Sequence, residues 1–103
     1  MLDAVREVQG FAASRSRPDL DHDRLLLLAL VKDVEIIGEA ATRVSADTRV
    51  EWPDIPWLDI VTMRHRLVHG YFDIDLDIVW STVTEDLPPL AAQLEKALAS
   101  VSR

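Results

Sequence analysis

The strongest constraint on the fold is one long apolar stripe in the first half of the chain. Its members recur at alternating steps of three and four residues for more than two heptads: Leu27, Leu30, Val34, Ile37, Ala41 and Val44. This spacing is typical of the buried seam of a helical bundle. Leu26, Leu28 and Val31 widen the stripe, so we expect this helix to touch neighbours on two sides, and a second copy of the chain is one candidate. The helix should begin near residue 19 and run to about Ser45.

Apolar residues at helical spacing predict three further helices. They cover roughly residues 2–15, 56–70 and 75–101. Pro88 and Pro89 have no backbone N–H, so they must break or kink the last of these helices. No stretch shows sustained alternation of apolar and polar residues, and the chain has only three Gly. We therefore expect an all-α, up-and-down bundle of four main helices with a kinked last helix.

The segment between the second and third helices differs from its neighbours. Residues 45–56 show little periodicity and include Pro53 and Pro56, which indicates an ordered loop. Three large apolar side chains should pin this loop to the bundle: Trp52, Ile55 and Trp57.

The composition favours a globular domain. Hydrophobic residues make up 49% of the chain, which is too many for a disordered protein. The longest unbroken apolar run, Leu25 to Val31, is too short to cross a membrane. The first residues mix acid and base and lead into no long apolar region, and there is no cysteine for a disulfide. We expect one domain over residues 1–103, in the cytoplasm.

The net charge limits how the protein could contact nucleic acid. Eighteen acidic against eleven basic residues give a formal net charge of −7, which argues against a protein that coats nucleic acid by electrostatics alone. Any contact with RNA must therefore be local. From Leu67 to Glu95 the chain has no Lys or Arg but six acidic residues, so this segment would repel a phosphate chain or attract a basic partner.

Chemistry is concentrated in the stretch from Met63 to Phe72, which holds two Arg, two of the three His and the only Tyr. RNA can be cut without a metal if a base removes the 2′-hydroxyl proton, a cation neutralises the phosphate and an acid protonates the leaving oxygen. His69 could be the base or the acid, because histidine titrates near neutrality. Arg64 could hold the phosphate oxygens. Tyr71 or a second histidine could supply the remaining proton.

Helical geometry complicates this arrangement. On one continuous helix, Arg64 and His69 lie ~140° apart around the axis, whereas Arg64 and Tyr71 nearly coincide. A distortion at Gly70, the length of the arginine side chain, or the matching residues of a second protomer must therefore bring Arg64 and His69 together.

The same residues have simpler interpretations. Arg and His near a helix end often cap carbonyls or face solvent, and a Tyr beside a Phe is often core. His65 and His69 are four residues apart and could hold a metal from one helical face, but the zincin spacing is absent. We therefore predict no metal site and no cofactor. Glu39 lies in an apolar helix and could be a buried partner for Arg64 or could face solvent.

The order Arg64, four residues, His69, one residue, Tyr71 resembles the signature of the HEPN superfamily, and specifically its HepT-like toxin branch. Further segments look like family hallmarks in the family's order and extend the resemblance over most of the chain: residues 34–41, 53–57, 79–83 and 86–88. One departure is His65, which stands where the family often has Asn after the motif arginine.

The resemblance implies a helical bundle that forms a homodimer, so that Arg64 and His69 of both subunits line a shared cleft. It implies a metal-independent endoribonuclease, the toxin of a toxin–antitoxin pair, whose partner is a minimal nucleotidyltransferase of the MNT type. That antitoxin would silence the toxin by transferring AMP to Tyr71. Apart from the resemblance, we count His65 and Glu39 as candidate supporting residues of the site. The alternative is a nuclease-inactive HEPN dimer that binds the nucleotidyltransferase or is modified by it.

Overall fold

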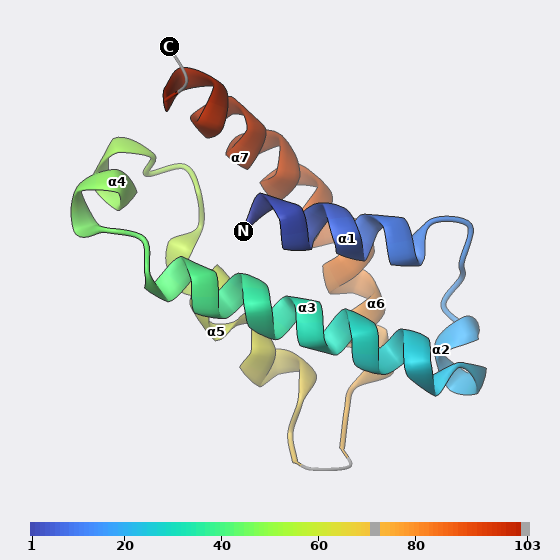
Figure 1. Ribbon diagram of the computed structural model, residues 1–103. Helices are drawn as coiled ribbons and strands as arrows, with labels where there is room; N and C mark the ends of the chain where they lie inside the picture. Colours follow the sequence, from blue (N-terminus) through green and yellow to red (C-terminus); the bar gives the residue numbers. More distant parts are fainter. Residues whose placement is uncertain (71–72, 102–103) are drawn as a thin grey trace.

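The structure, a computed structural model, describes residues 1–70 and 73–101 and has an all-α fold. Helix α3 crosses the centre of the molecule, with α1 packed on one side and α5 on the other, and α7 runs against α1 (Figure 1). The predicted bundle of four main helices with an interrupted last helix is confirmed. The elements in chain order are α1 (Leu2–Ala12), α2 (Asp19–His22), α3 (Arg24–Thr42), α4 (Ala46–Glu51), α5 (Trp57–Leu67), α6 (Leu76–Ser81), a π-helical turn (Thr82–Asp86) and α7 (Leu87–Val101).

The apolar stripe that predicts α3 forms the centre of the core. Leu30, Val34 and Ile37 have no exposed surface, and they are surrounded by buried residues of α1, α5 and the last helices. Leu26 and Val31, which widen the stripe, are buried too. In the part of the chain that the structure describes, no helix is long and apolar enough to cross a membrane.

Helix α3 begins later than predicted. The expected start near residue 19 is wrong, because Asp23 takes an extended conformation (φ −120°, ψ 90°) and separates the short α2 from α3. An Asp23 carboxylate oxygen accepts the N–H of Leu26 at 3.0 Å, so Asp23 is the N-cap of α3. At its other end α3 stops at Thr42 rather than Ser45. Similarly, α1 ends at Ala12 and not near residue 15.

The predicted loop over residues 45–56 contains the short helix α4. Ser45 starts this helix, because its hydroxyl oxygen accepts the N–H of Thr48 at 3.2 Å. The expected anchoring side chains are in place. Ile55 is buried, Trp52 and Trp57 are half-buried, and the Trp57 indole N–H donates to the carbonyl oxygen of Trp52 at 3.0 Å.

Helices α3 and α5 approach backbone to backbone at Gly38. A Cβ atom placed there would lie 3.2 Å from the carbonyl oxygen of Ile60 and 3.5 Å from that of Val61. Glycine therefore permits a helix approach that a larger side chain would oppose. This contact fixes the register of the two helices. One turn away on each, Glu35 of α3 faces Arg64 of α5.

The last helix is interrupted where its prolines remove backbone donors. Pro88 and Pro89 lie in the first turn of α7 and cannot donate to the preceding turn. The chain accommodates them with a π-helical turn, in which the N–H of Leu87 reaches the carbonyl oxygen of Thr82 five residues back.

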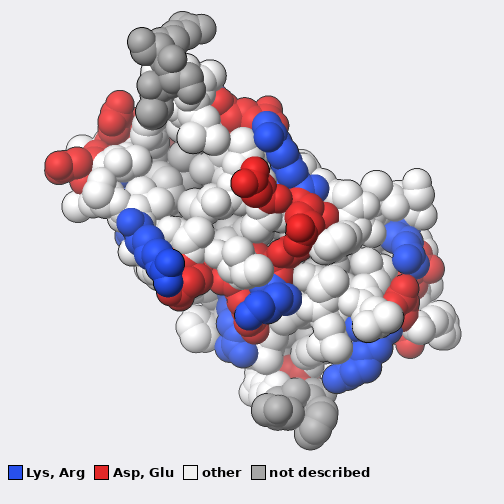
Figure 2. Space-filling view, in the orientation of Figure 1, with Lys and Arg blue, Asp and Glu red and all other residues white. Residues whose placement is uncertain are grey.

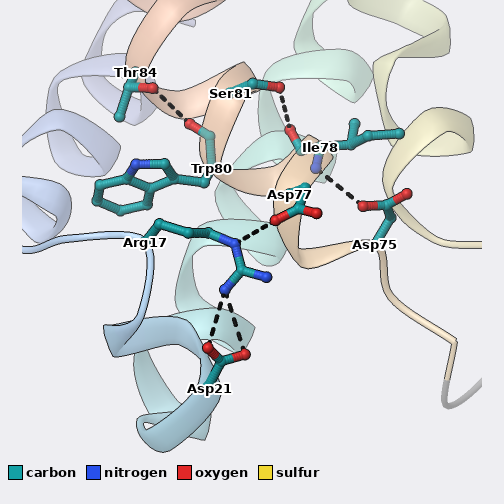
Figure 3. A network of polar contacts seen from close by, with 8 residues as sticks. All are labelled: Arg17, Asp21, Asp75, Asp77, Ile78, Trp80, Ser81 and Thr84. Carbon is teal, nitrogen blue, oxygen red and sulfur yellow. Dashed lines mark hydrogen bonds and ion pairs between the residues drawn. The ribbon is translucent and has the colours of Figure 1, made fainter.

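Arg17 fastens the connector between α1 and α2 to the start of α6. Its Nε donates to an Asp77 carboxylate oxygen at 2.6 Å and its Nη1 to Asp21 at 3.3 Å (Figure 3). The hydrogen bond to Asp77 and the charge of both carboxylates raise the pKa of Arg17. Asp75, two residues earlier, caps α6 by accepting the N–H of Ile78 at 3.1 Å. The beginning of α6 is thus held from two directions.

One acidic side chain is buried between α1 and α3. Asp33 is only 3% exposed, and its Oδ2 atom has no hydrogen-bond partner among the residues that the structure describes. Burial, together with the neighbouring carboxylate of Glu7, raises the pKa of Asp33 from its usual 3.8 to about 6. Because the folded protein binds this proton more tightly than the unfolded chain does, the stability that it contributes is present below pH 4 and is lost as the pH rises through 6.

Replacing Asp33 with Asn should therefore remove part of this pH dependence. At pH 8, Asp33→Asn should be more stable than the wild type by up to ~3 kcal/mol, and the difference should shrink toward pH 4. Urea unfolding of both proteins from pH 4 to pH 8 checks this expectation, with the exposed Asp3→Asn as the matched control. Parallel stability curves for wild type and Asp33→Asn would show that Asp33 has an ordinary pKa.

Candidate functional site

The helix that carries the motif ends earlier than predicted. Helix α5 stops at Leu67 and not at Gly70, because Val68 takes an extended conformation (φ −121°, ψ 111°). Val68 pairs with Ile74 in an isolated antiparallel bridge. The separation of ~140° between Arg64 and His69, which holds for one continuous helix, therefore does not apply.

Backbone hydrogen bonds close the connection between α5 and α6. The N–H of His69 donates to the carbonyl oxygen of Asp73 at 2.8 Å, and the N–H of Asp73 donates to that of Gly70 at 3.3 Å. At the base, the N–H of Asp75 donates to the carbonyl oxygen of Leu67 at 2.8 Å. The two limbs of this connection leave the bundle next to each other (Figure 1). This pairing holds His69 beside the last turn of α5.

Arg64 and His69 line one groove, as the motif requires. The groove has a volume of about 500 Å³ and lies between α3, the end of α5 and the connection to α6. The early end of α5, rather than a bend at Gly70, turns the chain so that both side chains reach it. Its lining residues are Leu28, Val31, Glu35, Arg64, Val68, His69, Gly70 and Ile74.

Arg64 is held by a carboxylate of α3. Its Nε donates to an oxygen of Glu35 at 2.7 Å, and the other oxygen of Glu35 lies 3.9 Å from the Lys32 ammonium. Within residues 1–70 and 73–101, the two terminal nitrogens of Arg64 make no hydrogen bond. The guanidinium is therefore anchored at one edge and free to bind an anion at the other.

Of the two interpretations of Glu39, the structure supports the solvent-facing one. Glu39 is not buried against Arg64 but is exposed, and it pairs with Arg43 at 3.3 Å. Sequence reasoning missed Glu35, because only the approach of α5 to α3 at Gly38 distinguishes it from Glu39, one turn later. Glu35 is one turn before Gly38, on the side of the close approach from which Arg64 emerges.

A second groove of about 610 Å³ continues along α3 and shares Glu35 and Arg64 with the first. It is lined by basic and acidic side chains, including Lys32, Arg43 and Glu39. On the face that carries α3, Figure 2 shows basic and acidic side chains beside each other rather than in separate patches. On this face, positive charge is available only locally, as we expect for a net charge of −7.

The other candidate residues are not gathered in this groove. His65 is exposed on α5 and does not line either groove. Tyr71 lies outside the described residues. Since α5 ends between His65 and His69, the two histidines do not share a helical face. Across the described ranges, no three His, Asp or Glu side chains gather into a metal site.

The fold and the groove define a small helical domain that presents an arginine and a histidine to solvent in one concavity. The family model described as "Ribonuclease HepT-like" matches residues 1–97. The chain therefore belongs to the HepT-like ribonuclease family.

Curated relatives agree with this assignment. "Probable ribonuclease HepT" of Thermococcus cleftensis is 34% identical over 96 residues, which cover 93% of this chain and 87% of that protein. "Putative RNase TTE0752" of Caldanaerobacter subterraneus is 35% identical over 94 residues, covering 91% and 80% of the two chains. "Putative RNase MJ1380" of Methanocaldococcus jannaschii is 30% identical over 95 residues, covering 92% and 87%. No solved structure is a significant match.

The exposure of the motif leads to a stability prediction. Arg64→Ala and His69→Ala should each lower the free energy of unfolding by less than about 1 kcal/mol, because both side chains are exposed and an exposed ion pair contributes little. Ile37→Ala should lower it by about 2–5 kcal/mol, since Ile37 is fully buried. Urea unfolding of the three variants measures this difference. If the motif variants unfold as early as Ile37→Ala, Arg64 and His69 are structural residues.

Proposed function

We propose that this protein is a metal-independent endoribonuclease whose catalytic residues are Arg64 and His69, acting as a homodimer. The observation that carries the proposal is the groove in which an anchored arginine with free terminal nitrogens meets an exposed histidine. Membership of the HepT-like ribonuclease family supports the reaction class. We extend the proposal to the whole chain, residues 1–103, as one HEPN domain.

The chemistry follows from what these two side chains can hold and transfer. A base removes the proton from a ribose 2′-hydroxyl, the 2′-oxygen bonds to the adjacent phosphorus, and the bond from phosphorus to the 5′-oxygen breaks. Arg64 stabilises the added negative charge on the phosphate oxygens. His69 transfers one of the two protons, either from the 2′-oxygen or to the 5′-oxygen.

One histidine cannot carry out both proton transfers at once, so the site needs a second group. A second protomer would supply another His69, and exposed apolar residues support such a dimer. On α3, Leu25, Leu28 and Ile36 are 82%, 43% and 42% exposed, and Leu58 of α5 is 74% exposed. Leu28 and Ile36 also line the two grooves, so a symmetric interface there would bring the two sites together.

The proposed biological role rests on the resemblance of Arg64, His69 and Tyr71 to the signature of HepT-like toxins. We place the protein in the cytoplasm as the toxin of a toxin–antitoxin pair, with a nucleotidyltransferase of the MNT type as antitoxin and Tyr71 as the acceptor of AMP. Tyr71 follows His69 by two residues, so an adenylyl group on it would place a bulky anion near Arg64. That anion would bind the Arg64 guanidinium and leave it unavailable to an RNA phosphate.

The second candidate function is a nuclease-inactive dimer that serves only as the partner of the nucleotidyltransferase. The net charge of −7 favours it, because most of the surface would repel RNA.

Expression without the antitoxin separates these two functions. Wild-type protein should arrest growth and degrade cellular RNA, whereas Arg64→Ala and His69→Ala should do neither, because each lacks a group that acts in the transition state. Growth curves and RNA integrity are measured together, after each variant has been shown to accumulate to the same level. Intact RNA and normal growth with the wild type would favour the nuclease-inactive dimer.

Coexpression with the nucleotidyltransferase tests the role of Tyr71 in the same cells. The antitoxin should restore growth with the wild type but not with Tyr71→Phe, since the phenylalanine lacks the acceptor oxygen. Rescue of both proteins would place the inhibitory contact or modification elsewhere.

A further inference from the structure

We propose that Glu35 is a positioning residue for the ribonuclease reaction, because it fixes the Arg64 guanidinium so that its two terminal nitrogens can bind the scissile phosphate. The inference rests on the proposed function and adds a residue to it. Glu35 comes from α3, outside the motif, and lines both grooves with Arg64.

The nitrogen of Arg64 that binds Glu35 determines which donors of the guanidinium remain for a phosphate. Within the described part of the chain, Glu35 accepts from Nε of Arg64, at 2.7 Å, and from neither of its terminal nitrogens. A guanidinium has five N–H donors, so four remain on the terminal nitrogens, enough for a two-point contact with phosphate oxygens. Arg17 shows the contrasting arrangement. Its Nε and Nη1 are both taken by carboxylates, Asp77 and Asp21 (Figure 3), as suits an arginine that fastens two parts of the fold.

The carboxylate is well placed to hold the arginine still. Glu35 is 31% exposed, and its neighbour Val34 is fully buried in the core. The approach of α3 to α5 at Gly38 sets the distance between the two helices one turn away. A long arginine side chain loses much conformational freedom when it binds an anion, and a partner that orders it beforehand reduces that cost.

The same carboxylate has an opposite effect on RNA binding. Its negative charge lies next to the cation that would hold a phosphate, so it repels the substrate. Glu35 should therefore weaken RNA binding while it speeds the chemical step. A residue that only supported the fold would not produce this combination, nor would one that merely competed with RNA for Arg64.

The test is steady-state cleavage of a single-stranded RNA by wild type, Glu35→Gln and Glu35→Ala. Glu35→Ala should lower kcat by ~10–100-fold, the effect of a misplaced catalytic group, and should lower KM by roughly two- to fivefold, the size expected for one exposed charge pair. Glu35→Gln keeps an oxygen that can accept from Nε, so it should recover most of kcat while retaining the lower KM.

A matched control is Glu95→Gln on α7, because Glu95 also pairs with an arginine, Arg6, at 3.4 Å, in a more exposed ion pair away from the grooves. It should change neither kcat nor KM. If Glu35→Ala keeps or raises kcat, Glu35 only competes with RNA and the inference is wrong. It is also wrong if Glu35→Ala raises KM, or if Glu35→Gln loses as much kcat as Glu35→Ala.

Arg64→Ala, measured in the same assay, separates this inference from the proposed function. If Arg64→Ala is inactive while Glu35→Ala matches the wild type, only the role of Glu35 fails. If the wild type does not cleave RNA, or Arg64→Ala cleaves it equally well, the proposed function fails and the positioning role fails with it.

Discussion

At Gly38 the backbones of α3 and α5 come close enough that an added Cβ would lie 3.2 Å from the carbonyl oxygen of Ile60. The fold and the candidate site both depend on this approach. On the buried side it lets Ile37 pack in the core without exposed surface. On the outer side it places Glu35 opposite Arg64, one turn away. A single small residue thus links the packing of the bundle to the orientation of its arginine.

The second determinant is the place where α5 stops. Val68 leaves the helix in an extended conformation, and its bridge to Ile74 closes the chain into a short loop. Two residues that would diverge on a continuous helix, Arg64 and His69, then line one groove. The far end of this loop is held by the cap at Asp75. The site therefore lies where α5 ends and the connection to α6 begins. Helical periodicity does not set the relative positions of residues on either side of this point.

Periodicity predicted the bundle because burial of apolar surface dominates folding, and the stripe through Leu30 and Ile37 has one way to be buried. The sequence did not reveal the break at Asp23, because a capping carboxylate resembles any acid in a first helical turn. From the sequence we considered Glu39 and missed Glu35 as the partner of Arg64, since only the approach of a second helix distinguishes two glutamates one turn apart. Long-range contacts of this kind leave no local pattern in a sequence.

Cleavage of a matched pair of oligonucleotides, in the presence of EDTA, tests the central claim most directly. One is an RNA, and the other carries a 2′-deoxy sugar at the cleaved position. If Arg64 and His69 drive attack by the neighbouring 2′-oxygen, the wild type will cut the RNA and leave a 2′,3′-cyclic phosphate, and it will not cut the deoxy strand at that position. Cleavage of both strands, or loss of all activity in EDTA that returns with added metal, would contradict this account.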